Sequence, residues 1–115
     1  MTLFKYEDVN WEKLGELIYR KHMHGSRLTI AQFKLLKGSV VNAHSHTHEQ
    51  VSIVISGKLR FVVNNETYIA GSGDVVYIPP NAVHGVEALE DSLIVDVYSP
   101  IRDDWLRGED KYLRS

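Results

Sequence analysis

The sequence contains no cysteine, no apolar run long enough to span a membrane and no block of charge of one sign. The absence of cysteine excludes a disulfide framework and a thiolate nucleophile or metal ligand. The 13 basic and 15 acidic side chains are interspersed, which argues against a nucleic-acid-binding surface. The first residues lack the apolar segment of a signal sequence, so we expect a cytoplasmic protein that does not enter a membrane.

What is present indicates one folded domain. The 115 residues are 43% hydrophobic and 24% charged, which is typical of a globular protein with a single core. Short apolar runs rich in Val, Ile, Phe and Tyr alternate with turn-forming residues. They predict strands at 27–36, 51–55, 58–63, 66–70, 75–78, 82–88 and 92–98. So many short strands bury their faces by forming a sandwich or a barrel, so we expect an all-β fold.

The turns between these strands are also legible. Asn64-Asn65 predicts a two-residue hairpin, and Ser56-Gly57 predicts a second hairpin. Gly71-Ser72-Gly73-Asp74 and Pro79-Pro80-Asn81 mark two further reversals.

The two ends of the chain are less distinctive. WEKLGELI could begin a short helix after Asn10, but we favour a strand from about Glu16 that leads into a hairpin at Gly25-Ser26. The segment DDWLRGEDKYLR is expected to lie outside the barrel as a solvated tail or short helix. One domain, 1–115, would then comprise an N-terminal strand or arm (1–26), a barrel (about 27–99) and a C-terminal tail (100–115).

The stretch NAHSHTHEQ, residues 42–50, carries three histidines at alternate positions. Alternate side chains of a strand share a face, so His44 and His46 have Cα atoms roughly 6 to 7 Å apart and can reach one metal ion. Gln50 can join them only if the chain turns near residues 47–49. His84, just after the Pro-Pro-Asn turn, can fold back onto the pair. Three imidazoles and an amide oxygen would leave room for water or substrate on the ion.

The spacing of these residues resembles the two sequence motifs of the cupin superfamily. The matching pattern is Gly38-x5-His44-x-His46-x3-Gln50-x6-Gly57 followed by Gly73-x5-Pro79-x-Asn81-x2-His84. The resemblance implies a small antiparallel β-barrel (a jelly roll, or double-stranded β-helix), often dimeric. It also implies one divalent transition metal ion (Ni, Zn, Fe, Mn or Cu) on His44, His46, Gln50 and His84. The fourth ligand of such sites is usually glutamate. An uncharged Gln50 would leave the ion a stronger Lewis acid and more loosely held.

A closer resemblance involves DVYSPIRDDW, residues 96–105, together with HSHTHEQ and IPPNAVHGVEAL. These segments are similar to the small cupins of pectin and alginate breakdown that linearise 4,5-unsaturated uronates to open-chain keto acids. That resemblance implies a sugar-acid substrate and a homodimer, with Asp96, Tyr98 and Arg102 around the metal. The aromatic residue there is commonly phenylalanine, where this chain has Tyr98.

The chemistry of these side chains agrees with such a role. Asp96 lies on the same strand face as Ile94 and Tyr98, where a purely structural barrel would place another hydrophobic residue. A carboxylate near a metal-bound substrate can act as acid or base. The planar guanidinium of Arg102 suits a uronate carboxylate.

Simpler roles remain open for the same residues. Asp96 could form an ion pair with Arg102 or Arg20, and Arg102 could be a solvated loop residue. His48 is expected at the rim of the site or behind its first layer. His22 and His24 are expected in an exposed or edge strand without partners.

Three functions are therefore compatible with the sequence. The first is a metal-dependent enzyme that opens and tautomerises an unsaturated uronate. The second is a metal-dependent dioxygenase, because three imidazoles can hold a redox-active ion. The third is a non-catalytic cupin that binds a metal or a small molecule. Gln50 and Asp96 favour the first.

Overall fold

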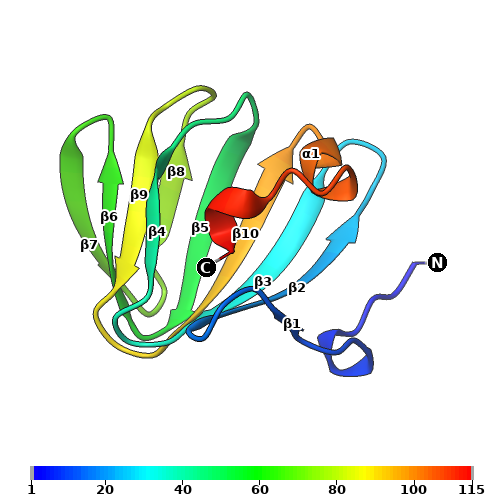
Figure 1. The fold of residues 1–115 in the computed structure, drawn as a ribbon, viewed down its shortest axis with the longest axis horizontal. Helices are drawn as coiled ribbons and strands as arrows, with labels where there is room; N and C mark the ends of the chain where they lie inside the picture. The colour runs from blue at the N-terminus through cyan, green and yellow to red at the C-terminus, as the bar shows by residue number, and fades with distance from the viewer. Residues whose placement is uncertain (1, 115) are drawn as a thin grey trace.

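The computed structural model describes residues 2–114, and its regular secondary structure is almost entirely β-strand (Figure 1). Each of the seven segments predicted to be strands contains one, and three more strands precede them or lie between them. The ten strands are β1 (Glu12–Lys13), β2 (Ile18–His24), β3 (Thr29–Leu35), β4 (Val40–His44), β5 (Glu49–Ser56), β6 (Lys58–Val63), β7 (Glu66–Gly71), β8 (Val75–Ile78), β9 (His84–Ala88) and β10 (Ser92–Ser99). Helical turns are η1 (Tyr6–Asp8), α1 (Asp103–Leu106) and η2 (Lys111–Leu113).

The strands form two antiparallel sheets that face each other, as Figure 1 shows. One sheet has the order β1-β2-β3-β10-β5-β8 and the other the order β4-β9-β6-β7. Consecutive strands therefore often belong to different sheets, which is the jelly-roll arrangement that the resemblance implied. The all-β prediction is confirmed.

The inner faces of both sheets form one hydrophobic core. In β3 and β10 every second residue is buried, as expected for strands with one face inward. Phe33, Leu59, Phe61, Ile78 and Ile94 are among the side chains that meet in this interior. Asp96 occupies an inward position of β10 in the middle of this series.

Of the hairpins predicted at Asn64-Asn65 and Ser56-Gly57, only the first is correct. Asn64 and Asn65 have φ of 49° and 68° and join β6 to β7 as a two-residue hairpin. Ser56-Gly57 does not make a hairpin, because β5 and β6 lie in different sheets. Gly57 instead turns the chain from one sheet to the other with φ of +97°, and a Cβ there would lie 2.2 Å from Ser92 Oγ. Such a corner shows the same Ser-Gly signal as a hairpin.

The N-terminal segment forms strands, as favoured, and not the alternative helix. β1 and β2 pair antiparallel, and β2 pairs with β3 through the turn at Gly25-Ser26. The longest α-helix in the described part of the chain has four residues, far too few to cross a membrane.

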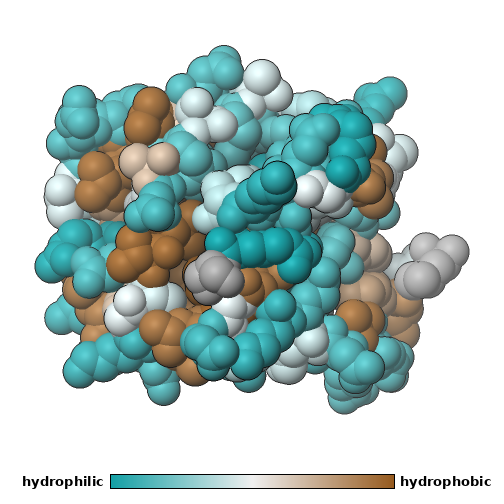
Figure 2. Space-filling model, in the orientation of Figure 1, coloured by the Kyte–Doolittle hydropathy of each residue, from teal (hydrophilic) through white to brown (hydrophobic). Residues whose placement is uncertain are grey.

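The prediction of a solvated C-terminal tail is wrong. Trp105, Asp110 and Leu113 are buried, and Figure 1 shows the segment passing in front of β5 and β10. Its outward surface is hydrophilic (Figure 2), which explains the misleading charge-rich sequence. Trp105, Tyr112 and Leu113 pack against the core, whereas Leu106 is exposed.

Candidate metal and substrate site

The four predicted metal ligands come together at one end of the barrel. His44 ends β4, and its Cα is paired with that of His84 at the start of β9. His46 lies in the loop after β4, and the chain bends at Thr47-His48 before Gln50 enters β5, as predicted. One ring nitrogen from each of His44, His46 and His84 lies within 4.8 Å of the other two. Such a group can hold a metal ion.

Backbone hydrogen bonds fix the orientation of all three imidazoles. The Nδ1 atoms lie 2.8 Å from Asn42 O for His44, 3.0 Å from His48 O for His46, and 2.9 Å from Ala82 O for His84. A carbonyl oxygen only accepts, so each Nδ1 carries the proton and each Nε2 keeps its lone pair. Histidine ligands in metal sites are commonly held in this way.

Gln50 adds an oxygen to this group. Its amide nitrogen donates to Ser52 Oγ at 3.0 Å and to Asp96 Oδ2 at 3.4 Å, which turns its Oε1 toward His46. Gln50 Oε1 then lies 3.1 Å from His46 Nε2, and neither atom has a proton to share. Two lone pairs that face each other repel unless a cation lies between them. The donor set of three imidazole nitrogens and one amide oxygen therefore fits a divalent transition metal.

The imidazoles are neutral at physiological pH. Burial lowers the pKa of His44 to about 4 and that of His46 to about 3. Burial also lowers the pKa of His84, and the positive charge of Arg102 acts in the same direction on all three. Neutral imidazole is the form that binds a metal, so protons compete weakly for this site.

Asp96 lies beside this group without forming an ion pair. Its Oδ2 accepts a hydrogen bond from Tyr98 Oη at 2.9 Å, and its Oδ1 is buried with no hydrogen-bond partner in the described chain. Burial raises its pKa to about 6, although the hydroxyls of Ser52 and Tyr98 and the charge of Arg102 act in the opposite direction. Within residues 2–114 neither Arg102 nor Arg20 pairs with it. Asp96 can therefore exist as acid or base near neutral pH.

Arg102 is fully buried and is not the solvated loop residue considered as an alternative. Its Nε and Nη2 donate to the two carboxylate oxygens of Asp104 at 3.0 and 2.8 Å. Nη2 also donates to Tyr112 Oη at 2.6 Å, whereas Nη1 is buried without a partner. The guanidinium lies 4.7 Å from the ring centres of Tyr98 and Trp105. Because Asp104 occupies the Nε–Nη2 edge, a bidentate contact of that edge with a substrate carboxylate would require Asp104 to leave.

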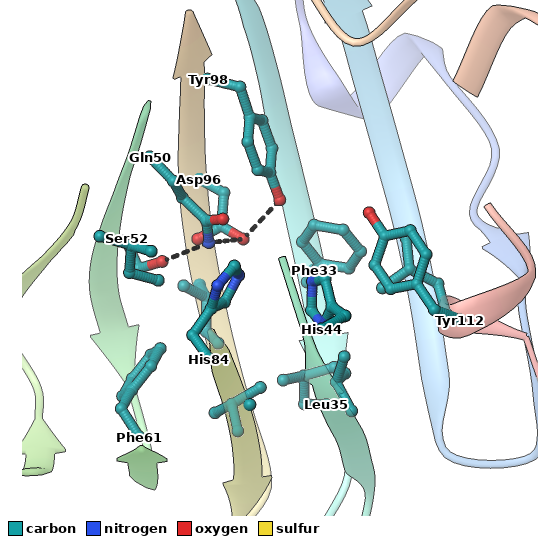
Figure 3. A pocket seen from close by; sticks show the side chains of 16 residues that line it. Phe33, Leu35, His44, Gln50, Ser52, Phe61, His84, Asp96, Tyr98 and Tyr112 are labelled. Carbon is teal, nitrogen blue, oxygen red and sulfur yellow. Dashed lines mark hydrogen bonds between the residues drawn. The ribbon is translucent and has the colours of Figure 1, made fainter. Parts of the chain in front are cut away.

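A cavity of about 40 Å³ lies among these residues. Figure 3 shows Gln50 and Ser52 on one side of it and Tyr112 on the other, with His44, His84 and Asp96 between them. Its deeper wall is apolar and includes Phe33, Phe61 and Ile94. This volume holds water molecules and not a whole sugar. A six-carbon substrate would extend beyond the cavity or displace part of its wall.

Several neighbouring predictions can now be compared with the structure. His48 lies behind the predicted metal ligands, as expected. Its side chain is buried against Ile101 O, and its backbone carbonyl orients the imidazole of His46. Glu49 accepts a hydrogen bond from Tyr77 on the outside of the sheet, away from the imidazoles. The expectation that His22 and His24 lack partners is wrong, because the side chains of Glu12 and Thr29 reach them and Trp105 packs against His22. His22 Nδ1 lies 2.8 Å from Glu12 Oε1, and His24 Nδ1 lies 2.7 Å from Thr29 Oγ1.

Sequence reasoning missed the residues that the C-terminal segment brings to the site. Tyr112 lines the cavity, with its ring centre 4.3 Å from that of His44. Asp104 and Trp105 surround Arg102. The sequence feature that could have predicted this packing is the presence of two aromatic residues, Trp105 and Tyr112, in an otherwise charged segment.

Comparisons with known proteins agree with this architecture. The family described as "Cupin domain" matches residues 31–99. The pectin degradation protein KdgF of Dickeya dadantii is 34% identical over 103 residues, which cover 87% of this chain and 94% of that protein. The structure of KdgF from Halomonas sp. has 31% identity and a TM-score of 0.86, and the match covers 91% of this chain and 98% of that one. An RmlC-like cupin from Shewanella frigidimarina has 25% identity and a TM-score of 0.86, over 91% and 96% of the two chains. The chain belongs to the cupin family and is a homologue of the pectin degradation protein KdgF.

Proposed function

We propose that the protein is a metal-dependent enzyme that linearises 4,5-unsaturated uronates. The observation that carries the proposal is the buried carboxylate of Asp96, with one oxygen unpaired, in the same cavity as the imidazoles of His44 and His84. A barrel that served only as a scaffold would not bury such a group. Homology to KdgF supports a substrate derived from pectin.

The metal ligands in this proposal are His44, His46, Gln50 and His84. Their support is the shared orientation of the three imidazoles and the close approach of Gln50 Oε1 to His46 Nε2. A divalent ion bound there would act as a Lewis acid on a substrate oxygen. Divalent ions differ in their intrinsic affinity for such a site, and copper, nickel or zinc tends to bind more tightly than the physiological ion. The ion is therefore identified by the activity of the protein after reconstitution with each metal.

The reaction is an isomerisation that needs one proton acceptor and one proton donor. The bond between the ring oxygen and the anomeric carbon breaks as the anomeric hydroxyl loses its proton and the ring oxygen gains one, which gives an aldehyde and an enol. The enol then loses its O–H proton and gains a proton at C4, which gives the open-chain keto acid. We assign this proton transfer to Asp96, through the Oδ1 that has no hydrogen-bond partner among residues 2–114.

Tyr98 and Arg102 complete the proposed catalytic group. The hydroxyl of Tyr98 holds Asp96 through Oδ2, which leaves Oδ1 for substrate. Arg102 supplies positive charge next to the cavity and favours an acid over a neutral sugar.

The test is turnover of a 4,5-unsaturated monouronate by metal-reconstituted protein, followed as loss of its ultraviolet absorbance. We expect decay well above the spontaneous rate, loss of activity in Asp96→Asn and His46→Ala, and full activity in Asp8→Asn, whose carboxylate is exposed in η1. Decay at the spontaneous rate in the parent protein would refute the proposal. Uptake of dioxygen by the metal-loaded protein, measured with an oxygen electrode, would instead favour the dioxygenase activity that three imidazole ligands also permit.

A further inference from the structure

The cavity wall has one part that does not belong to the barrel. All of its lining residues lie in strands except Tyr112 and Leu113, which come from η2. Figure 3 shows Tyr112 on the side of the cavity that faces Gln50 and Ser52. A substrate that extends from the cavity toward η2 would therefore contact Tyr112.

The hydroxyl of Tyr112 is prepared to donate a hydrogen bond. It accepts hydrogen bonds from Arg102 Nη2 at 2.6 Å and from Trp105 Nε1 at 3.2 Å. A phenol that accepts two bonds still has one proton to give. Among the residues that the structure describes, no hydrogen bond is donated by this hydroxyl. Acceptance from a charged guanidinium makes the remaining proton a stronger donor.

Tyr112 also connects Arg102 with the cavity. Arg102 is not among the residues that line it, although its guanidinium is stacked against Tyr98 and bonded to Tyr112, which both do. The charge of Arg102 therefore reaches a ligand in the cavity first through the hydroxyl of Tyr112. Asp104 holds the other edge of the guanidinium and keeps it in this position.

We propose that Tyr112 is a substrate-binding residue whose hydroxyl donates a hydrogen bond to the carboxylate of the acid substrate, with Arg102 behind it. This inference rests on the proposed function for the class of substrate, but it concerns binding and not turnover. The partners of the hydroxyl would then be two donors from the protein and one anion from the ligand.

The test is calorimetric titration of metal-loaded protein with D-galacturonate and with its methyl ester. These ligands are stable hexuronate analogues that differ in the charge of one group. In Tyr112→Phe we expect affinity for the acid to fall about tenfold, as for the loss of one hydrogen bond to a charged group, and affinity for the ester to stay unchanged. Tyr68→Phe is the matched control, because Tyr68 is exposed and its hydroxyl bonds to Glu66 alone in the described part of the chain. It should bind both ligands like the parent protein.

Two outcomes would overturn the proposal. One is an affinity of Tyr112→Phe for the acid that does not fall, or that falls by the same factor as its affinity for the ester, because the hydroxyl would then not bind the carboxylate. The other is no measurable binding of the acid by the parent protein. If the parent binds the acid and Tyr112→Phe binds it less tightly while no unsaturated uronate is turned over, this inference stands and the proposed function fails.

Discussion

Replacement of Asp96 by asparagine is expected to make the metal-free protein more stable at high pH and also inactive. Burial raises the pKa of Asp96 from 3.8 to about 6. Each tenfold change in proton affinity corresponds to about 1.4 kcal/mol, so the ionised carboxylate costs the folded state about 3 kcal/mol above pH 6. Below pH 3.8 the group is protonated in both states and this cost disappears. Stability of the parent protein therefore falls as the pH rises through this window, and Asp96→Asn does not share that fall.

The assay is urea denaturation of both proteins at pH 4 and pH 8 after metal removal. The asparagine can still accept from Tyr98, but its amide nitrogen takes the place of an oxygen that has no partner, which offsets about 1 kcal/mol at either pH. The difference in unfolding free energy between variant and parent should be about 2 to 3 kcal/mol more favourable to the variant at pH 8 than at pH 4. Protonation of the imidazoles affects both proteins alike and cancels. A difference that does not change with pH would refute the reasoning, because it would mean that Asp96 titrates like an exposed carboxyl group.

Three further predictions follow from the same geometry. Because the pKa values of His44 and His46 are about 4 and about 3, the metal affinity of the folded protein should change by less than about threefold between pH 5.5 and 8. A steep loss of metal affinity below pH 6.5 in equilibrium dialysis would show that the imidazoles are not desolvated. Tyr98→Phe removes a hydrogen bond that lowers the pKa of Asp96, so the acidic limb of the kcat/KM profile should move to higher pH, while Tyr77→Phe on the outer surface should leave the profile in place. Gly57→Ala should destabilise the protein by about 2 kcal/mol or more, because its Cβ would clash with Ser92 and the Asp91 carbonyl. Gly73→Ala has open space around its Cβ and should cost only about 1 kcal/mol for its positive φ. Equal losses of unfolding free energy for the two variants in urea denaturation would contradict the close approach at Gly57.

The sequence was most informative where a local pattern has a single structural meaning. Asn64-Asn65 permits the positive φ of a two-residue hairpin, and the alternation around Asp96 places it inward with Ile94 and Tyr98. The bend at Thr47-His48 followed from a distance, since Gln50 could not reach the imidazoles along a straight strand. Such arguments need only the geometry of one or two strands.

Predictions that depended on contacts between distant segments were less successful. Ser56-Gly57 has the same local form in a hairpin and in a corner between sheets, and only the pairing of β5 with β10 distinguishes them. The charges of residues 103–114 concealed that Trp105, Tyr112 and Leu113 face the core. The contact of Arg102 with Tyr112 could not be deduced either, because Tyr112 reaches it only after the segment has folded back over the barrel, whereas Asp104 lies only two residues from Arg102.

The most direct test of the central claim is proton NMR of the product formed from a 4,5-unsaturated monouronate in D₂O. If Asp96 delivers the proton, one deuterium should enter at C4 on a single face, at a rate that falls to the spontaneous level in Asp96→Asn. Deuterium on both faces of C4, formed at the same rate with and without the protein, would contradict the account.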